Sequence, residues 1–308
     1  MPTAEVLIST KPVATGQLPL ADGVLLATQG GPGSDPAARL AHLFSIRRQV
    51  PIEALTVLEP LSSEVLAYAP STYDLDRQRR EGVTDAVHAQ LRRTANAENV
   101  PLVIEEGRAA ECIAGRAQAR GAALIAMGIG RHEPLDRLLG VEPAIAVLHR
   151  TSVPVLAASP GSRPVLRSIV IATDFSPAAL RAARIALAFA ADDVTVHLVH
   201  AWPWMDLGGS GAPTWFSVYE AGVQALADEL VRALPLPPNA KVVTHLQHGE
   251  AEKVVLEVAN ANWADLIALG SHGRGLFDRL TLGSVAEGVL RKAKCSVLIA
   301  PPTPTEKE

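Results

Sequence analysis

The sequence predicts an α/β fold of two tandem open parallel five-stranded sheets, each doubly wound by helices in a Rossmann-like way. Three observations predict it: length, an internal repeat and the alternation of strands with helices. The chain has 308 residues, about twice a typical domain of roughly 150 residues. Strand-like apolar runs alternate with helix-length segments in both halves, which is typical of parallel βαβ units covered by helices on both faces.

The internal repeat indicates a duplicated domain. GAALIAMG at 121–128 matches WADLIALG at 263–270, an offset of 142 residues, and residues 25–29 match residues 170–174 at an offset of 145. Solenoid repeats recur every 20–50 residues or so, far below this period. The stretch 158–166 is rich in Pro, Gly and Ser, so we expect one domain over residues 1–160 and a second over residues 161–308.

The second half shows the expected elements most clearly. The apolar run 167–173 predicts a strand buried on both faces. Ser176 and Pro177 then supply an N-cap and a proline at the first helical position, which predicts a helix through about Ala191. Further strands are expected at 194–200, 241–247, 265–269 and 295–300, and further helices at 217–233, at 250–262 and from about Ser284.

Composition and charge exclude several classes of protein. A net charge of −4 and a pI near 6.2 argue against a nucleic-acid partner, which requires basic surface. No uncharged apolar run approaches about 18 residues, and no signal peptide is evident, so we expect no membrane association and a cytoplasmic location. Cys112 and Cys295 form no CxxC motif; we expect both to be small, buried, apolar side chains.

A glycine pattern in the second half predicts a phosphate site. Gly270 and Gly273 follow a predicted strand, and after nine residues Gly283 and Ser284 open a helix. Free backbone N–H groups and the helix dipole attract anions at such a position. The lysine of a GxxxxGK[ST] loop is missing, so this is a different phosphate cradle. Asp174 ends the first strand of this half, at the sheet edge where open α/β sheets bind ligands.

These residues resemble the universal stress protein family, and the duplication makes the chain similar to a tandem member. The most specific segments are IVIATDFSPAAL (169–180), DLIALGSHGRG (265–275) and LGSVAEGVL (282–290). ATP-binding members carry the pattern G-x2-G-x9-G-[ST], which the second half matches. The resemblance implies an adenine nucleotide alpha hydrolase-like fold. It also implies that the last strands of the two domains meet in an intrachain pseudo-dimer; whether the chain also forms a homodimer stays open.

The resemblance further implies an ATP site in the second domain. Mg²⁺ could accompany ATP there through phosphate oxygens and water. Asp174 would hold the ribose, while Ala172, Thr173, Ala201 and Leu269 would wall the adenine. The backbone of Gly270, Gly273, Gly283, Ser284 and Val285 would cradle the phosphates, with His272 and Arg274 beside them. ATP occupancy would bias nearby loops, and a regulatory protein partner would read the difference in a stress response.

The first half departs from the pattern at the decisive positions. Gln29 replaces Asp174, Arg131 replaces Gly273 and Val141 replaces Ser284, while Glu142 adds negative charge at the helix entrance. Like charges repel there, so we expect the first domain to have lost nucleotide binding. Pairing of Arg131 with an anion is the alternative.

Two other functions remain open. A slow ATP hydrolase would need a catalytic side chain near the terminal phosphate, for which His272, Arg274 and Asp278 are the candidates. Without a clear general base we expect weak hydrolysis at most. A tandem scaffold that binds no nucleotide is the other possibility, and the intact glycine pattern argues against it.

Several residues also have a purely structural interpretation. Ser284 and Glu287 fit a helix capping box. The residues Trp202, Trp204 and Trp215 would form either a hydrophobic lid on the long helix or a cover over the nucleotide or a partner surface.

Two further patterns are expected to carry no site. His245 and His248, like His197 and His200, are three residues apart on a strand and so face opposite sides, which argues against a metal pair. The loop at residues 30–33 (GGPG) is expected to be a flexible turn rather than an anion cradle.

Overall fold

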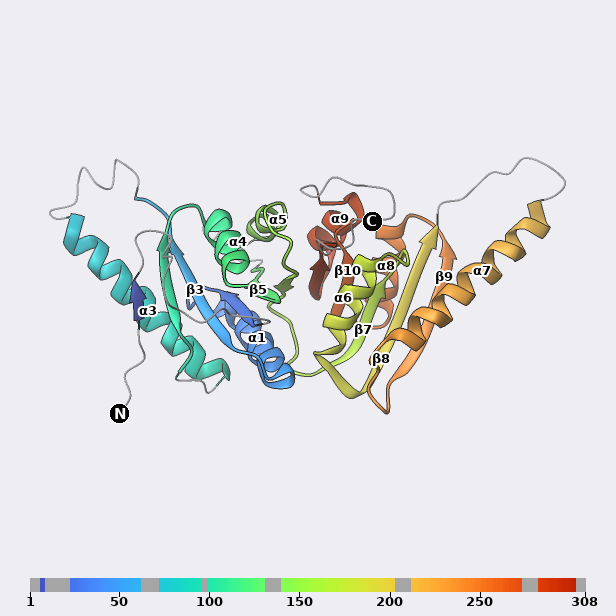
Figure 1. Ribbon diagram of the computed structural model, residues 1–308, viewed down its shortest axis with the longest axis horizontal. Coiled ribbons are helices and arrows are strands. Elements are labelled where there is room, and N and C mark those ends of the chain that lie inside the picture. Colours follow the sequence, from blue (N-terminus) through green and yellow to red (C-terminus); the bar gives the residue numbers. More distant parts are fainter. Residues whose placement is uncertain are drawn as a thin grey trace. The chain divides into compact units, whose positions relative to one another are not determined.

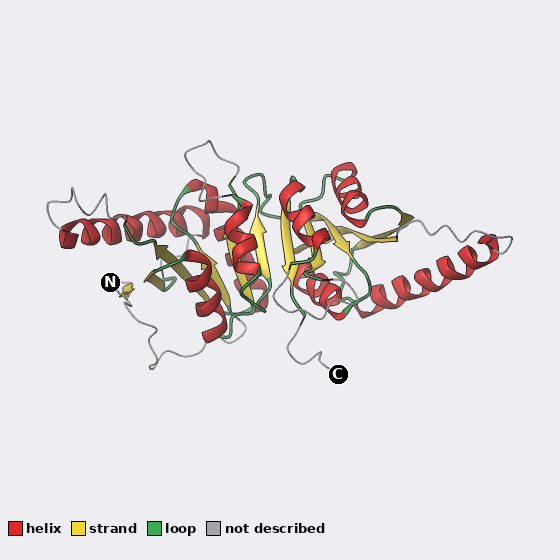
Figure 2. Ribbon diagram, turned by 90° about the horizontal axis from the view of Figure 1, so that it is seen from above, coloured by secondary structure: helices red, strands yellow, loops and turns green. Residues whose placement is uncertain are grey.

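A computed structural model describes residues 6–8, 23–61, 72–95, 99–130, 140–202, 212–272 and 282–302. The chain divides into two compact units, Met1–Pro164 and Val165–Glu308, and each is described by itself. In each unit a parallel sheet lies between helices on both faces (Figures 1 and 2). The predicted α/β class is therefore confirmed, while the pairing of the units as a pseudo-dimer stays a prediction.

The described residues of unit 1 form a six-stranded parallel sheet in the order β1-β4-β3-β2-β5-β6. Its strands are β1 (Val6–Ile8), β2 (Val24–Ala27), β3 (Ile52–Leu58), β4 (Leu102–Glu106), β5 (Leu124–Gly128) and β6 (Val155–Ala158). Its helices are η1 (Pro32–Ser34), α1 (Asp35–Arg48), α3 (Thr72–Ala95), α4 (Ala109–Ala119) and α5 (Val141–Leu148). The expectation of five strands was wrong for this unit, because the N-terminal β1 pairs with the edge strand β4.

In the part of unit 2 that the structure describes, the expected five parallel strands follow the order β11-β10-β7-β8-β9. The strands are β7 (Leu166–Ala172), β8 (Ala190–Trp202), β9 (Lys241–His248), β10 (Leu266–Gly270) and β11 (Ser296–Ala300). The helices are α6 (Pro177–Leu187), α7 (Ala212–Ala233), α8 (Ala251–Ala261) and α9 (Ser284–Lys292). Strand order reverses direction at β7, so β7 and β10 form the switch point where such sheets bind ligands.

Burial explains why the central strands have continuous apolar sequences. Ile169, Val170 and Ile171 of β7 are all 0% exposed, although consecutive side chains of a strand point to opposite faces. Helix α6 packs on β7, β10 and β11, and α8 packs on β7 and β8. Both faces of β7 are therefore covered, and a strand in that position must be apolar throughout.

Two boundaries differ from the sequence-based expectation. Helix α6 ends at Leu187 rather than near Ala191, because the buried Phe189 leads the chain into β8 and Ala190 pairs with Leu166 of β7. Helix α7 begins at Ala212, five residues before the predicted start. Helical periodicity alone does not show where sheet pairing takes over from an alanine-rich helix.

One further expectation was wrong at the level of single residues. Cys112 and Cys295 are half-buried free thiols rather than fully buried ones, and burial raises the pKa of the Cys295 thiol to about 12. In the GGPG loop (30–33), whose flexibility stays a prediction, Pro32 and Gly33 begin η1, and a Cβ on Gly30 would lie 2.4 Å from the backbone of Ala86. Across the described ranges, no helix is long and apolar enough to cross a membrane.

Candidate functional site

A cavity of about 180 Å³ lies in unit 2 where β7, β8 and β10 end and α9 begins. Its lining comprises Ala172, Thr173, Asp174, Val199, Ala201, Ala251, Val255, Leu269, Gly270, Ser271, His272, Gly283, Ser284, Val285 and Ala286. Every predicted site residue in the described part of the chain belongs to this lining. Gly273, Arg274 and Asp278 lie outside the described residues. Segments distant in sequence thus meet around one cavity, and their binding role stays a prediction.

The apolar wall includes residues that sequence analysis missed. Val199 shares a strand face with the predicted Ala201, because every second residue of a strand points the same way. That alternation was a usable signal. Ala251 and Val255 are one turn apart on α8, and only the packing of this helix on β8 brings them to the cavity. These small aliphatic side chains form a narrow wall suited to a flat apolar group.

The loop after β7 fixes the carboxylate of Asp174. The backbone N–H of Thr173 donates to Val199 O at 2.8 Å, and that of Ser176 donates to Asp174 Oδ1 at 3.0 Å. Ser176 is the N-cap of α6, its Oγ accepting from the Ala179 N–H at 3.3 Å. Because Ser176 caps α6, Asp174 is not needed as the cap. Its carboxylate instead lines the cavity, held by the hydrogen bond from the Ser176 N–H.

The two described glycines of the pattern stand where a larger side chain would collide with backbone or with α6. A Cβ on Gly283 would lie 2.9 Å from Ser271 O, which already accepts the Gly283 N–H at 2.8 Å. A Cβ on Gly270 would lie 3.1 Å from the Cβ of Ala178. The glycines therefore bring the end of β10, α6 and the start of α9 unusually close together.

The first turn of α9 presents its backbone to the cavity. Gly283 is the N-cap, and the next three residues, Ser284 to Ala286, all line the cavity. The N–H groups of a first turn have no partner within their helix and favour anions. The capping-box interpretation was wrong: Ser284 is the first helical residue, and Glu287 pairs with Arg291 at 2.8 Å.

Two polar side chains adjoin the helix start. Ser271, only 4% exposed, has its Oγ 2.9 Å from His272 Nδ1. This contact orients the imidazole beside the Gly283–Ser284 turn. The described lining thus combines one carboxylate, one imidazole, a helix N-terminus and an apolar wall. Such a set can bind a molecule that has a flat apolar part, hydroxyl groups and an anionic tail.

Unit 1 offers a different set at the equivalent positions. Gln29 is exposed after β2, and Glu142 lies exposed in the first turn of α5, whose N-cap is Gly140. Arg131 lies outside the described residues. A carboxylate therefore stands at the helix start in unit 1, where unit 2 has Val285.

The histidines of β8 and β9 pair across strands. His197 Nδ1 lies 3.1 Å from His245 Nε2; the pairs considered from sequence were along single strands. Burial lowers the pKa of both rings, and His245 lowers that of His197 further. Within the described ranges, no group of three or more His, Cys, Asp or Glu side chains could hold a metal ion.

Of the three tryptophans in the predicted lid, the structure describes the side chain of Trp202. Trp202 is 4% exposed and contacts His200 and His248 at ring-centroid distances of 5.8 and 4.7 Å. Trp204 and the side chain of Trp215 lie outside the described residues. The lid therefore stays a prediction, although Trp202 itself is part of the interior.

Comparisons with known proteins agree on one family. The profile of the "Universal stress protein family" matches residues 22–159 and 166–301. A universal stress protein of Mycolicibacterium smegmatis is 27% identical over 298 residues, covering 91% of this chain and 97% of the relative. One from Methanocaldococcus jannaschii is 33% identical over 139 residues, covering 43% of this chain and 81% of the relative. The crystal structure of a universal stress protein from Archaeoglobus fulgidus aligns with a TM-score of 0.63 at 20% identity, covering 91% of this chain and 98% of that one.

Proposed function

The chain belongs to the universal stress protein family, with two such domains in tandem, and from this premise we propose that its second domain binds ATP. The nucleotide would make the protein a regulatory module of a stress response. A cytoplasmic location and a protein partner that reads nucleotide occupancy belong to the same proposal.

One observation carries the proposal: Asp174, the glycine turn and the first turn of α9 converge on a single cavity with an apolar wall. The wall formed by Val199, Ala201 and Leu269 would enclose the adenine. Asp174 would accept hydrogen bonds from the ribose hydroxyls. The backbone of Gly283 to Val285 would receive the phosphates, and His272 stands beside that turn.

The residues present fit ATP chemically. A Cβ at Gly270 or Gly283 would push apart the segments that form the cradle, and a helix N-terminus supplies N–H donors without a basic side chain. Mg²⁺ would be held by phosphate oxygens and water, since Asp174 is the single carboxylate in the described lining. We propose binding rather than turnover as the main activity.

We propose one site per chain. Gln29 lacks the carboxylate of Asp174, and Glu142 opposes an anion at the start of α5. Unit 1 would then serve as a related domain without a nucleotide.

Isothermal titration calorimetry of the full chain with ATP tests this proposal. We expect one site, at least about tenfold weaker binding in Asp174→Gln, which copies the residue of unit 1, and unchanged binding in Gln29→Ala. A tenfold loss corresponds to about 1.4 kcal/mol, in the range of a hydrogen bond to a charged group. No ATP binding by the unaltered chain, or equal affinity in Asp174→Gln, would overturn the proposal.

A further inference from the structure

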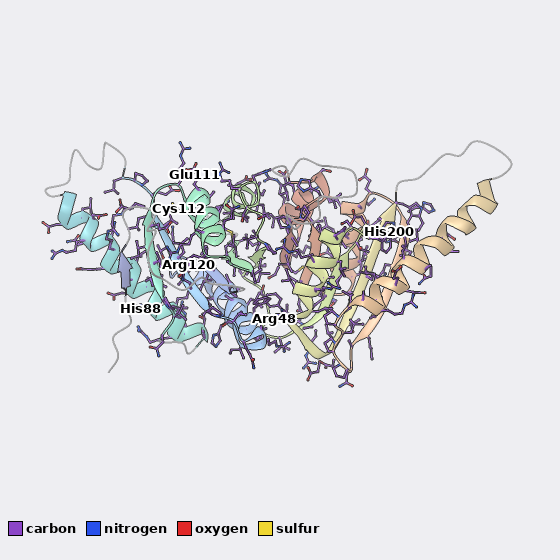
Figure 3. The ribbon with its side chains drawn as sticks, viewed as in Figure 1. Arg48, His88, Glu111, Cys112, Arg120 and His200 are labelled. Atoms are coloured by element: carbon purple, nitrogen blue, oxygen red, sulfur yellow. The ribbon has the colours of Figure 1, made fainter. Side chains whose placement is uncertain are left out.

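Behind the cavity, on the other face of the sheet, His200 contacts both neighbours of Asp174. Strand alternation points the cavity residues Val199 and Ala201 one way and His200 the other. Figure 3 shows His200 toward the carboxyl end of β8. We infer that His200 is a positioning residue, an inference that rests on the proposed ATP site. Its contacts hold the Thr173–Phe175 loop in the conformation in which Asp174 can bind the ribose.

The first contact is a hydrogen bond to the loop backbone. His200 Nδ1 lies 2.7 Å from Thr173 O. A carbonyl oxygen can only accept, so the ring donates from Nδ1. Thr173 N–H is already bonded to Val199 O. The N–H and the carbonyl of Thr173, the residue before Asp174, are therefore both hydrogen-bonded to residues of β8.

The second contact supports an unfavourable backbone conformation. Phe175 has a φ of 60°, in the left-handed region that residues with a Cβ disfavour. Its N–H donates to Thr173 Oγ1 at 2.9 Å, and its ring lies 4.7 Å from that of His200, tilted by 43°. Phe175, the residue after Asp174, is therefore held by the ring of His200 and by the hydrogen bond of its N–H to Thr173.

Unit 1 builds the same turn from other residues. Thr28 and Gly30 correspond to Thr173 and Phe175: Gly30 has a φ of 79°, and its N–H bonds to Thr28 Oγ1 at 3.1 Å. The residue matching His200 is Thr56, whose Oγ1 donates to Thr28 O at 2.7 Å. Glycine adopts a positive φ without a supporting ring, so a threonine is sufficient there.

The comparison separates the two tasks of His200. A donor to the carbonyl is common to both units, whereas a ring is needed only where Phe175 replaces glycine. His200 is itself held in place, because Trp202 stacks beside it at 5.8 Å and 28°. The loop that bears Asp174 is therefore set by a side chain that does not line the cavity.

The test is a set of ATP titrations on the full chain. His200→Phe keeps a ring but removes the donor, and we expect about tenfold weaker ATP binding. His200→Thr keeps a donor but removes the ring and should bind with intermediate affinity. Adding Phe175→Gly to His200→Thr copies unit 1 and should restore affinity to within about threefold of the unaltered chain.

A double-mutant cycle with Asp174→Ala distinguishes positioning from general support of the fold. If His200 acts through Asp174, His200→Phe costs no further affinity once the carboxylate is gone. Unchanged affinity in His200→Phe, an equal loss in the Asp174→Ala background, or no recovery in the double variant would overturn the inference. The ATP proposal would still stand if Asp174→Ala weakens binding, whereas no binding by the unaltered chain overturns both.

Discussion

Trp263 occupies a backbone conformation that a glycine holds at the equivalent position of unit 1. Its φ is 49°, and the side chain, on the turn between α8 and β10, is 81% exposed. Gly121 in the matching turn has a φ of 64°. A left-handed conformation costs a residue with a Cβ roughly 1–2 kcal/mol. With so little of the ring buried, packing offsets only a small part of that cost.

We therefore expect Trp263→Gly to stabilise the protein. Relief of the left-handed conformation should exceed the roughly 0.4–1 kcal/mol that glycine loses through its greater freedom in the unfolded chain, for a net gain of about 0.5–1 kcal/mol. Urea unfolding followed by circular dichroism measures the change, with Gly121→Trp as the opposite substitution, expected to destabilise. A lower free energy of unfolding in Trp263→Gly would contradict this account.

Among the elements, α3 is joined to the loop between β2 and α1 by one buried amide. Gln90 is 0% exposed; its Oε1 accepts from Thr28 Oγ1 at 2.7 Å, and its Nε2 donates to Ser34 Oγ at 2.8 Å. Nε2 also contacts Asp35 Oδ1 at 3.1 Å, which in turn pairs with Arg93. Nε2 also donates to Gly31 O at 3.2 Å, so this network joins both ends of the glycine-rich loop to α3.

Replacing the Gln90 amide by an apolar group of similar size should lower the free energy of unfolding. In Gln90→Leu the buried hydroxyls of Thr28 and Ser34 lose a partner, and we expect a loss of about 1–3 kcal/mol in the free energy of unfolding. Gln224→Leu is the matched control, since Gln224 bonds Asp228 on the exposed face of α7 and should change stability by under about 0.5 kcal/mol. Equal effects of the two variants in urea unfolding would show that the network contributes little.

The sequence predicted the elements, and the residues that meet around the cavity, wherever a local pattern specified them. Apolar runs located β7 and β10, and glycine spacing located the start of α9. Features that depend on pairing between distant segments were not predictable: the register that brings His197 to His245, the bonds of Gln90 to the loop after β2, and the wall residues of α8. The end of α6 at Leu187 belongs to the same class, because pairing of Ala190 with β7 ended the helix.

At the scale of the whole molecule, duplication kept the backbone of the turn after the first strand and changed its side chains. The backbone N–H groups of Thr28 and Thr173 each donate to the neighbouring strand, and the hydroxyl of each threonine accepts from the N–H two residues further on. Both units have a glycine N-cap at the equivalent helix, Gly140 at α5 and Gly283 at α9, but only unit 2 has a carboxylate directly after the threonine, at Asp174, and a serine directly after the glycine. The two domains thus share the backbone of this turn and differ in a few side chains at the carboxyl ends of their strands.

Hydrogen exchange of the full chain with and without ATP would show which domain responds. At an ATP concentration a hundred times the Kd, a bound site gains about 2.7 kcal/mol of stability, so amides in residues 172–176, 269–272 and 283–286 should exchange more slowly. The equivalent residues 27–31, 127–130 and 140–143 of unit 1 should not change, and Asp174→Gln should abolish the protection in unit 2. Slower exchange at residues 127–130 or 140–143 that persists in Asp174→Gln would contradict the proposal of one site per chain. It would show that unit 1 binds ATP even though Gln29 stands there in place of a carboxylate.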